Sequence, residues 1–311
     1  MTHLFRRAAF LLTAVLCTAA LFAGCAGMKP DSTAAPEPVR IKEHAAVSYL
    51  GPAGTYTEEA AQLFFGDDAS LSPQTTVDDA IAELNAGNAD YAVIPQENTI
   101  GGAVTNYVDA LIRQEDVYVV GEVVLPISQT LMGLPGTELS DIRTVCSHAQ
   151  GIAQSAAWRS EHLPDAVTEE KDSTAAAASY VVETGDKSVA AIAAPGAASL
   201  YGLEVLAENV QITMENKTRF YVLSREADTA VHTNAVFVAT CKADLIDDIL
   251  VDLHEAGLEL TALHDRPEGS TLGSYYYIIE AENESGITGE QIAAVTAHPE
   301  IRYLGSFQVT T

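Results

Sequence analysis

Residues 216–220 (NKTRF) bring an amide, an ammonium group, a hydroxyl and a guanidinium together in a chain with few basic residues. They lead into the apolar run 220–223 (FYVL), which is typical of a buried strand. The hydroxyl of Thr218 could donate a proton to a leaving group, and the guanidinium of Arg219 could bind a carboxylate through two hydrogen bonds. The same residues could also be the ordinary polar start of a strand. Both interpretations are open from this stretch alone.

A glycine-containing loop at residues 51–61 (GPAGTYTEEAA) could bind an anion. Gly54 allows a close turn, and Thr55 and Glu58 have the spacing of a capping box at the next helix. Unpaired amides at a helix start attract carboxylates and phosphates. The loop lacks the G-K-[ST] ending of a phosphate-binding loop and the G-x-G-x-x-G of a dinucleotide site. A capped turn without a ligand explains it equally well.

Two further loops stand between a predicted strand and a predicted helix. The loop 94–104 (IPQENTIGGAV) contains Asn98, and the loop 146–151 (CSHAQG) contains Ser147 and Gln150. Each polar residue could contact a substrate or act only as a helix cap. The adjacent serine and histidine do not predict a hydrolase, because neighbours at a strand end point to opposite sides and no G-x-S-x-G elbow is present.

The residues around these loops predict an α/β fold. From residue 46 onward, short strand-like runs such as 91–95 (YAVIP) alternate with Ala-rich amphipathic stretches such as 149–163 (AQGIAQSAAWRSEHL). This alternation is typical of a doubly wound parallel sheet covered by helices, in which ligands bind at the carboxyl ends of the strands. The run 121–133 (GEVVLPISQTLMG) continues without a helix. We therefore expect two α/β lobes with crossing strands and a cleft between them.

A second domain is predicted after the polar segment 226–233 (EADTAVHT), which has no apolar periodicity and is interpreted as a linker. The following segments read in the order β-α-β-β-α-β, with a helix predicted at 243–257 (ADLIDDILVDLHEAG). This order predicts a ferredoxin-like fold. Because that fold serves many functions, it does not by itself predict a ligand.

The composition excludes several classes of function. The 311 residues carry 16 Lys and Arg against 43 Asp and Glu, and the net charge of −27 repels nucleic acid. An anionic substrate must therefore be bound by a local positive site. No CxxC or His/Cys cluster predicts a metal. Cys146 and Cys241 fall in different predicted domains, so no disulfide is expected between them.

The N-terminus predicts export. Two arginines precede the charge-free run 8–23, which is too short for a comfortable membrane span and ends in small residues before Cys25. LFAGC resembles a bacterial lipobox, so we expect residues 1–24 to be a signal peptide, Cys25 to carry lipid and residues 25–45 to form a tether. The protein would then be an extracytoplasmic lipoprotein held at the membrane. An uncleaved anchor helix is one alternative, and a translation start at Met28, which would give a cytoplasmic protein, is another.

Taken in order, the polar loops and the second domain resemble the prephenate dehydratase family. GPAGTYTEEAA is similar to the family's G-P-x-G-T-F-S-x-x-A-A, IPQENTIGGAV to its P-I-E-N-S-x-x-G-x-V, CSHAQGIAQ to its S-H-P-Q-A-x-x-Q, and NKTRF to its N-x-T-R-F. LHDRP, at residues 263–267, resembles the E-S-R-P signature of the ACT domain. The resemblance covers residues 46–311.

The resemblance implies a two-lobed catalytic domain at residues 46–225, with the architecture of periplasmic binding proteins, and a ferredoxin-like ACT regulatory domain at residues 232–311. It also implies the decarboxylative dehydration of prephenate to phenylpyruvate without a cofactor or metal, a homodimer or homotetramer, and phenylalanine as an effector. By the resemblance, Thr218 is the catalytic hydroxyl. The residues that it places in or beside the substrate cleft are Thr55, Asn98, Ser147, Gln150 and Arg219.

Two features of the catalytic motifs qualify this assignment. Arg219 neighbours Thr218 along a strand, so it could point away from the cleft and pair with an acid such as Glu97. Gln96 stands where the family has an apolar residue.

The ACT resemblance departs further from the family. The effector residues that the alignment implies are Asp244, Leu245, Glu259 and Arg266, and His264 and Asp265 replace the family's E-S. An acid at position 244, where the family has Gly, and an acid at position 259, where it has Asn, both oppose phenylalanine. We therefore expect phenylalanine to bind weakly or not at all.

A second class of function fits the same architecture. A lipid-anchored binding protein could capture a small carboxylate in the cleft without converting it. The presence of Thr218, Asn98 and Gln150 favours the enzyme, because a binding protein has no need of a hydroxyl placed to donate a proton.

Overall fold

The computed structural model describes residues 41–213 and 215–311, which form two α/β lobes and a C-terminal domain. The predicted signal peptide, the lipidation site Cys25 and most of the predicted tether lie outside the described residues. No helix in the described ranges is long and apolar enough to cross a membrane.

Lobe 1 is built on a seven-stranded sheet. Its strands lie in the order β16-β5-β11-β3-β1-β2, and β4 pairs with β3. β1 is parallel to β2 and β3, whereas β11 is antiparallel to β3 and β5, so the expected parallel sheet is parallel only in part. The strands are β1 (Ala46–Leu50), β2 (Ser70–Gln74), β3 (Tyr91–Asn98), β4 (Gly102–Ala103), β5 (Tyr118–Pro126), β11 (Lys217–Ser224) and β16 (Val309–Thr310), and the helices are α1 (Tyr56–Phe65), α2 (Val77–Ala86) and α3 (Thr105–Arg113).

Lobe 2 has a five-stranded sheet in the order β10-β6-β9-β7-β8. β7 is parallel to β8 and β9, and β6 is antiparallel to β9 and β10. Small residues of β9 and α6 pack closely in its core. The strands are β6 (Thr130–Gly133), β7 (Thr144–Ser147), β8 (Val167–Glu170), β9 (Val189–Ala193) and β10 (Glu204–Ala207), and the helices are α4 (Ala149–Gln154), α5 (Ala156–His162), α6 (Thr174–Thr184) and α7 (Pro195–Tyr201), with a 3-10 turn at Leu139–Asp141.

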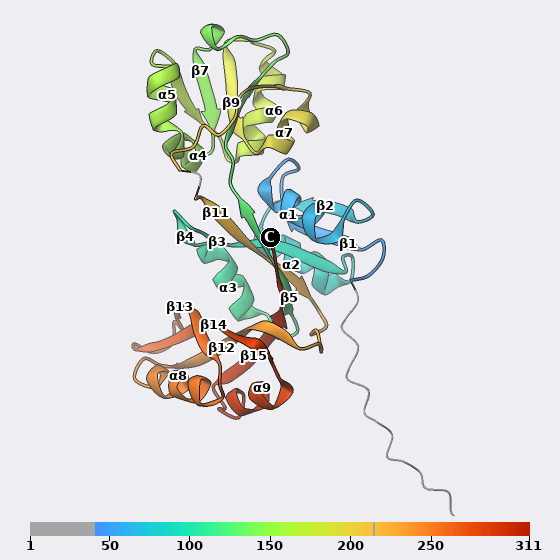
Figure 1. Ribbon diagram of the computed structural model, residues 1–311, viewed down its shortest axis with the longest axis vertical. Coiled ribbons are helices and arrows are strands. Elements are labelled where there is room, and N and C mark those ends of the chain that lie inside the picture. The colour runs from blue at the N-terminus through green and yellow to red at the C-terminus, as the bar shows by residue number, and fades with distance from the viewer. Residues whose placement is uncertain (1–40, 214) are drawn as a thin grey trace, which may run out of the picture. The chain divides into compact units, whose positions relative to one another are not determined.

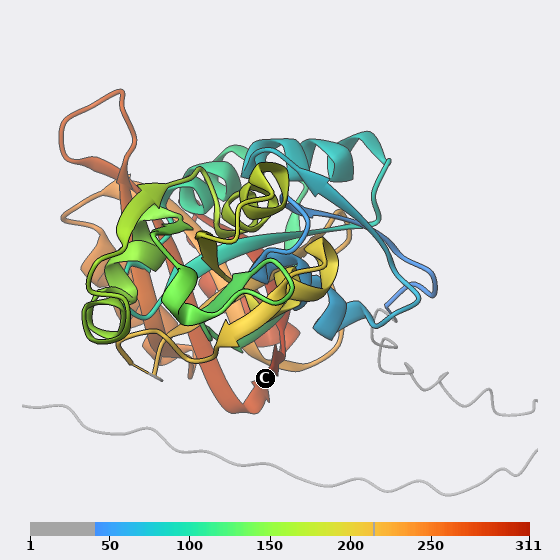
Figure 2. The same ribbon diagram turned by 90° about the horizontal axis from the view of Figure 1, so that it is seen from above.

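Two connections cross between the lobes, as the run without a helix predicted (Figure 1). The chain passes from β5 to β6 through residues 127–129 and later returns from β10 to β11. Strands β5 and β11 are antiparallel neighbours in the lobe 1 sheet. The view from above in Figure 2 has lobe 2, in green to yellow, nearest the viewer. The backbone N–H of Ile127 donates to the carbonyl of Asn216 at 2.8 Å, so the two crossings are bonded to each other.

The C-terminal domain has the predicted β-α-β-β-α-β order. Its antiparallel sheet has the strand order β13-β14-β12-β15, which is that of a ferredoxin-like fold. The predicted helix 243–257 is shorter than expected and runs from Ile246 to Glu255. The elements are β12 (His232–Lys242), α8 (Ile246–Glu255), β13 (Glu259–Pro267), β14 (Ser274–Ile287), α9 (Gly289–Val295) and β15 (Ile301–Phe307).

The two faces of this sheet pack against different partners. Along β12, Ala235, Phe237 and Ala239 face the helices α8 and α9, whereas Val236 and Val238 belong to a core shared with α3 and β5 of lobe 1. This alternation follows from the two-residue period of a strand. The C-terminal domain therefore buries its open sheet face on lobe 1.

Two further features join the C-terminal domain to lobe 1. The predicted linker 226–233 is partly structured, because β12 begins at His232 and the buried Asp228 contacts the His232 ring at 2.8 Å. After β15 the chain adds β16 to the edge of the lobe 1 sheet, parallel to β5. Gly305 has φ +139°, and a Cβ atom there would lie 2.1 Å from the Val119 carbonyl oxygen. Neither the returning strand nor this close approach was predicted.

Candidate active site

A cavity of about 690 Å³ opens where the two connections cross between the lobes. Its walls come from loops at the ends of strands in both lobes, as expected for an α/β fold of this kind. The lining residues that matter for chemistry are Thr55, Asn98, His148, Gln150, Gln154 and Thr218.

Thr218 and Asn98 form the polar centre of this cavity. They lie opposite each other in the paired strands β11 and β3, and the Asn98 side-chain Nδ2 donates to Thr218 Oγ1 at 2.9 Å. The Asn98 Oδ1 accepts from the backbone N–H groups of Ile100 at 3.0 Å and Gly101 at 3.1 Å. These two bonds fix the orientation of the amide, so its N–H groups must face Thr218. Because Thr218 Oγ1 accepts this bond, and no acceptor for its proton occurs among the described residues, its own hydrogen can be donated into the cavity.

Behind this polar centre lies a network of buried side-chain amides that are hydrogen-bonded to Asn98. Asn216 is 1 % exposed and accepts from Asn98 Nδ2 at 2.8 Å, and its own Nδ2 donates to Gln154 Oε1 at 3.1 Å. Gln154 is also buried, and within the described part of the chain its Nε2 has no hydrogen-bond partner. An unpaired buried donor in the cavity wall suits an oxygen atom of a ligand. We did not predict Asn216 or Gln154 as site residues, although both lie within the motifs quoted above.

Gln150 and His148 reach the cavity from the start of α4 in lobe 2. Gln150 Nε2 lies 3.4 Å from Asn98 Oδ1, which is a long contact across the cavity. The His148 ring caps α4, and its Nδ1 accepts from the Gln150 backbone N–H at 3.3 Å. This bond leaves Nε2 of the exposed ring as the atom that can donate to a ligand.

Thr55 lines the cavity at the start of α1, but the predicted capping box is not formed. Its hydroxyl makes no cap bond and lies 3.4 Å from the Leu50 carbonyl, while the Glu58 carboxylate accepts from the Gly54 N–H at 2.5 Å. Gly54 has φ +83° and approaches Leu200 of lobe 2 closely. The first amides of α1 are therefore not capped by Thr55, which suits an anion better than the predicted box.

Ser147 is not a wall residue of the cavity, which corrects its predicted place. It is fully buried, and its Oγ donates to the Ile192 carbonyl at 2.7 Å. A Cβ atom at Gly151 would lie 2.3 Å from that Oγ. Ser147 thus packs beneath the start of α4, because the residue next to a strand end points away from its exposed neighbour.

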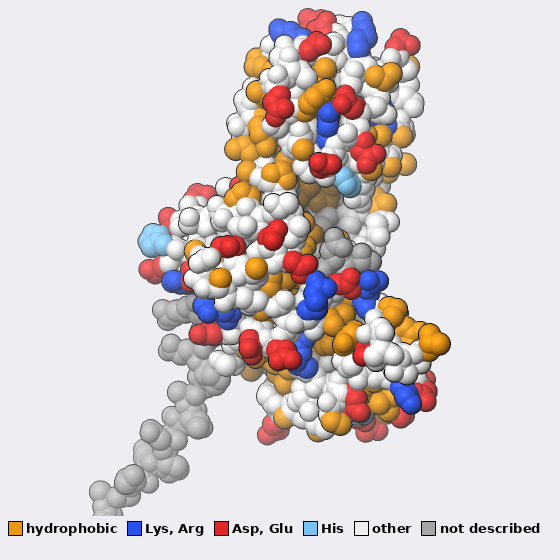
Figure 3. Space-filling model, turned by 180° about the vertical axis from the view of Figure 1, so that it is seen from behind, with side chains coloured by type: hydrophobic (Ala, Val, Ile, Leu, Met, Phe, Trp, Pro, Cys, Tyr) orange, Lys and Arg blue, Asp and Glu red, His pale blue; other side chains and the backbone are white. Residues whose placement is uncertain are grey.

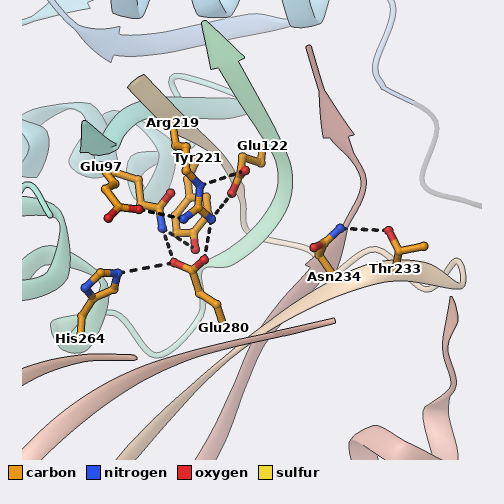
Figure 4. A network of polar contacts seen from close by, with 9 residues as sticks. Glu97, Glu122, Arg219, Tyr221, Thr233, Asn234, His264 and Glu280 are labelled. Atoms are coloured by element: carbon orange, nitrogen blue, oxygen red, sulfur yellow. Dashed lines mark hydrogen bonds and ion pairs between the residues drawn. The ribbon is translucent and has the colours of Figure 1, made fainter. Parts of the chain in front are cut away.

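Arg219 is likewise absent from the wall of the cavity, where the resemblance had implied a contact with substrate. Its guanidinium binds the Glu122 carboxylate through Nε at 3.1 Å and Nη2 at 2.7 Å, and Nη1 lies 3.0 Å from Glu97 (Figure 4). A third carboxylate, from Glu280 of the C-terminal domain, also contacts Nη2. This is the alternative in which Arg219 pairs with acids on the opposite face of the strand. Burial opposes the charge on Arg219, but the Glu122 hydrogen bonds and the nearby carboxylates outweigh it and raise its pKa.

The predicted effector residues do not form one site. Asp244 and Leu245 line a cavity of about 560 Å³ together with three other acids, Asp248, Glu268 and Glu300. Glu259 is exposed on the edge strand β13 and is not in its wall. Arg266 binds Asp109 of α3 at 2.6 and 3.0 Å. Glu259 and Arg266 therefore do not line the cavity that holds Asp244 and Leu245, and an effector role of the four residues stays a prediction.

Comparison with known proteins decides the family. The family model for prephenate dehydratase matches residues 47–228, which include both lobes and the cavity. The chain belongs to the prephenate dehydratase family. Prephenate dehydratase from Lactococcus lactis is 32 % identical over 276 residues, covering 85 % of this chain and 97 % of that protein. The enzyme from Amycolatopsis methanolica is 34 % identical over 270 residues, covering 84 % and 88 %.

A solved structure agrees with this assignment. Prephenate dehydratase in complex with L-Phe from Arthrobacter aurescens is 33 % identical and has a TM-score of 0.76, covering 85 % of this chain and 90 % of that chain. The chain accordingly catalyses the family's reaction, the loss of water and carbon dioxide from prephenate to give phenylpyruvate in aromatic amino acid biosynthesis. This finding favours the enzyme over the binding protein.

Proposed function

We propose that Thr218 is the general acid of the dehydration and that it protonates the C4 hydroxyl of prephenate as that group leaves. The supporting observation is that Asn98 donates to Thr218 Oγ1 and so directs the threonine proton toward the cavity. The C4–O bond breaks to release water, the bond to the ring carboxylate breaks to release carbon dioxide, and its electron pair completes the aromatic ring.

The size of this contribution is limited by the chemistry of threonine. Positioned general acids contribute roughly 10²- to 10⁴-fold in rate. Threonine is a weak acid, so orientation by the Asn98 and Asn216 network must supply part of the effect, and aromatisation drives the reaction. Loss of its proton leaves Thr218 as an alkoxide, which regains a proton from solvent water before the next turnover.

The substrate is a dianion, and its carboxylates need partners other than Arg219. No Lys or Arg is found among the described residues that line the cavity. We assign this role to the Nε2–H of the His148 ring, the first amides of α1 and the unpaired Nε2 of Gln154. Three partners of this kind can hold an anion without a large positive field, because each is a fixed donor.

Turnover by the purified chain tests the reaction. Prephenate is added, and phenylpyruvate is followed by the absorbance of its enolate at high pH. We expect turnover in the wild type, a kcat lower by about 10²- to 10⁴-fold in Thr218→Ala, and substantial activity in Thr218→Ser, which keeps a hydroxyl. Tight binding of prephenate without turnover in the wild type would leave only the binding protein. Full activity of Thr218→Ala would remove Thr218 from its role.

We further propose that the C-terminal domain is an ACT regulatory domain that pairs subunits into a homodimer or homotetramer, and that it binds phenylalanine weakly. Its cavity carries the four acids Asp244, Asp248, Glu268 and Glu300 against one base, Lys242, and so repels an amino acid carboxylate. Calorimetry should detect no binding at micromolar phenylalanine. Micromolar affinity would contradict the proposal, and sedimentation would give the number of subunits.

We also propose that the chain is exported and anchored by lipid on Cys25. The support is the sequence LFAGC behind a charge-free run. Radiolabelled palmitate should label the full chain and not Cys25→Ala, and the labelled protein should remain with the membranes. A cytoplasmic, unlabelled product that starts at Met28 would contradict this.

A further inference from the structure

A charged cluster lies inside the apolar contact between lobe 1 and the C-terminal domain. The surrounding core contains Tyr107 and Val119 of lobe 1 and Val236 and Ile278 of the C-terminal domain, all buried. Within it, the Arg219 guanidinium meets three carboxylates from three different strands. We call Arg219, Glu97, Glu122 and Glu280 the arginine cluster (Figure 4). Each charge in such an apolar contact needs an opposite charge within bonding distance, because an unpaired buried charge destabilises the folded state.

Glu280 is the member that comes from the C-terminal domain. Its side chain is 5 % exposed and that of Glu122 is 4 % exposed. Arg219 contacts both carboxylates, and the His264 ring lies 3.8 Å from Glu280 as a second, more distant partner. In β14, Glu280 follows Ile278 on the face that packs against lobe 1, whereas Ile279 faces the helices. Through its contact with Arg219, Glu280 therefore joins the C-terminal domain directly to β11.

A β-bulge places another polar group in the same cluster. Arg219 pairs with Glu97 and Phe220 with Pro95, so Gln96 is an extra residue in β3. Its buried amide donates to Glu280 and, at 3.1 Å, to the Tyr221 hydroxyl. Without the bulge, Gln96 would share the cavity face with Asn98. Because of the bulge, both Gln96 and Glu97 face the arginine cluster, while the next residue, Asn98, faces the cavity.

The catalytic pair lies one residue away from these contacts. Thr218 and Asn98 stand on the cavity face, and their chain neighbours Arg219 and Glu97 are bonded to each other on the opposite face. A shift of the Arg219 backbone therefore moves the Thr218 hydroxyl. From this geometry we propose that Glu280 is a positioning residue for the reaction: through Arg219 it holds the start of β11 and so the direction of the Thr218 proton.

This inference rests on the proposed role of Thr218, and it makes the C-terminal domain part of the catalytic machinery. Displacement of a catalytic group by about 1 Å can reduce the rate by about 10²-fold. We expect Glu280→Gln, in the full chain, to lower kcat by about 10- to 100-fold and to change KM by less than about twofold, because prephenate does not touch Glu280.

Glu282→Gln is the matched control, since Glu282 lies on the same strand, two residues further on, and is not among the acids that form ion pairs with Arg219 in the described residues. Its kcat should equal that of the wild type. Circular dichroism at the assay temperature gives the folded fraction of each variant, and kcat is expressed per folded molecule.

An unchanged kcat in Glu280→Gln, an equal loss in Glu282→Gln, or a rise in KM alone would overturn the inference. Should Glu280→Gln not fold, Arg219→Lys replaces it, because lysine keeps the charge but cannot bind two carboxylates through a fork. The same loss of kcat is expected, and wild-type kcat would again overturn the inference.

An assay of Thr218→Ala beside these variants distinguishes failure of the proposed function from failure of the positioning role of Glu280. If it is fully active, the proposed function fails. If it is inactive while Glu280→Gln has wild-type kcat, only the positioning role of Glu280 fails.

Discussion

The two faces of the lobe 1 sheet at the start of β11 use opposite kinds of chemistry. On the cavity face, Thr218 and Asn98 belong to a neutral hydrogen-bonded network. On the opposite face, Arg219 is enclosed by the carboxylates of the arginine cluster. Acidic side chains are also spread over the surface seen in Figure 3. In a chain this acidic, a strong cation joins two domains, and the partners that we propose for the substrate are neutral donors and one histidine.

Removal of the Arg219 charge should have the largest effect on folding and a small direct effect on substrate binding. Arg219→Met leaves Glu122 and Glu280 buried without a cation, which we expect to lower the free energy of unfolding by about 3–5 kcal/mol. Urea unfolding followed by circular dichroism measures this. Arg113→Met, at an exposed ion pair with Asp78, is the control and should cost less than about 1 kcal/mol.

The same variant can also disprove the division of roles between the two faces of the sheet. If Arg219→Met keeps its stability and raises KM for prephenate about 100-fold, Arg219 binds substrate after all.

Loss of His148 should act on the cavity face alone. His148→Gln replaces the rigid ring and its Nε2–H donor with a flexible amide, so KM for prephenate should rise about tenfold, which corresponds to about 1.4 kcal/mol. The glutamine oxygen can still accept the cap bond of α4, so the free energy of unfolding should change little. Steady-state kinetics measure it. His162→Gln, on the exposed surface of the same lobe, should keep the wild-type KM. Equal KM values in the two variants would show that His148 does not hold the dianion.

The smallest expected effect is the contribution of Glu122 to the pH dependence of the free energy of unfolding. Burial raises the pKa of Glu122, although its hydrogen bonds to Arg219 act against this. The folded state therefore holds this proton more tightly than the unfolded state, and the contribution of Glu122 to stability is full below the ordinary pKa of a glutamate and is lost as pH rises through the raised pKa.

Glu122→Gln should remove this dependence. The stability of the wild type relative to Glu122→Gln should fall as pH rises through that window, as urea unfolding at several pH values would show. A difference that grows in favour of the wild type with rising pH would mean that pairing with Arg219, rather than burial, governs Glu122.

The sequence predicted the centre of the site better than its edges. Thr218 lies in a motif at the start of one predicted strand and Asn98 in a motif at the end of another, and antiparallel pairing of these strands brings the two residues together. Arg219 and Ser147 were misplaced for one reason, since adjacent residues in a strand face opposite sides and the side that holds the cavity is set by tertiary packing. Glu97 was named in advance as a partner of Arg219, whereas Glu122 and Glu280 were not, because they lie 97 and 61 positions away in the sequence.

The fold shows a similar division. Local patterns predicted two lobes, their crossing strands and the β-α-β-β-α-β order of the C-terminal domain. They did not predict that β11 is antiparallel to its neighbours, because strand direction depends on the path of the whole chain. The bulge at Gln96 was also hidden, since it is defined only by the register of two paired strands.

Because strand β16 pairs with β5, lobe 1 and the C-terminal domain cannot be separated by a single cut in the chain. The polypeptide leaves lobe 1 after β11, builds the C-terminal domain, and then completes the edge of the lobe 1 sheet beside β5. A single cut in residues 226–231 would therefore separate lobe 1 from one of its own strands and expose the backbone of β5 to pairing with other chains. The C-terminal domain of such a protein cannot be deleted or exchanged as an independent module without repair of the lobe 1 sheet to which the chain returns.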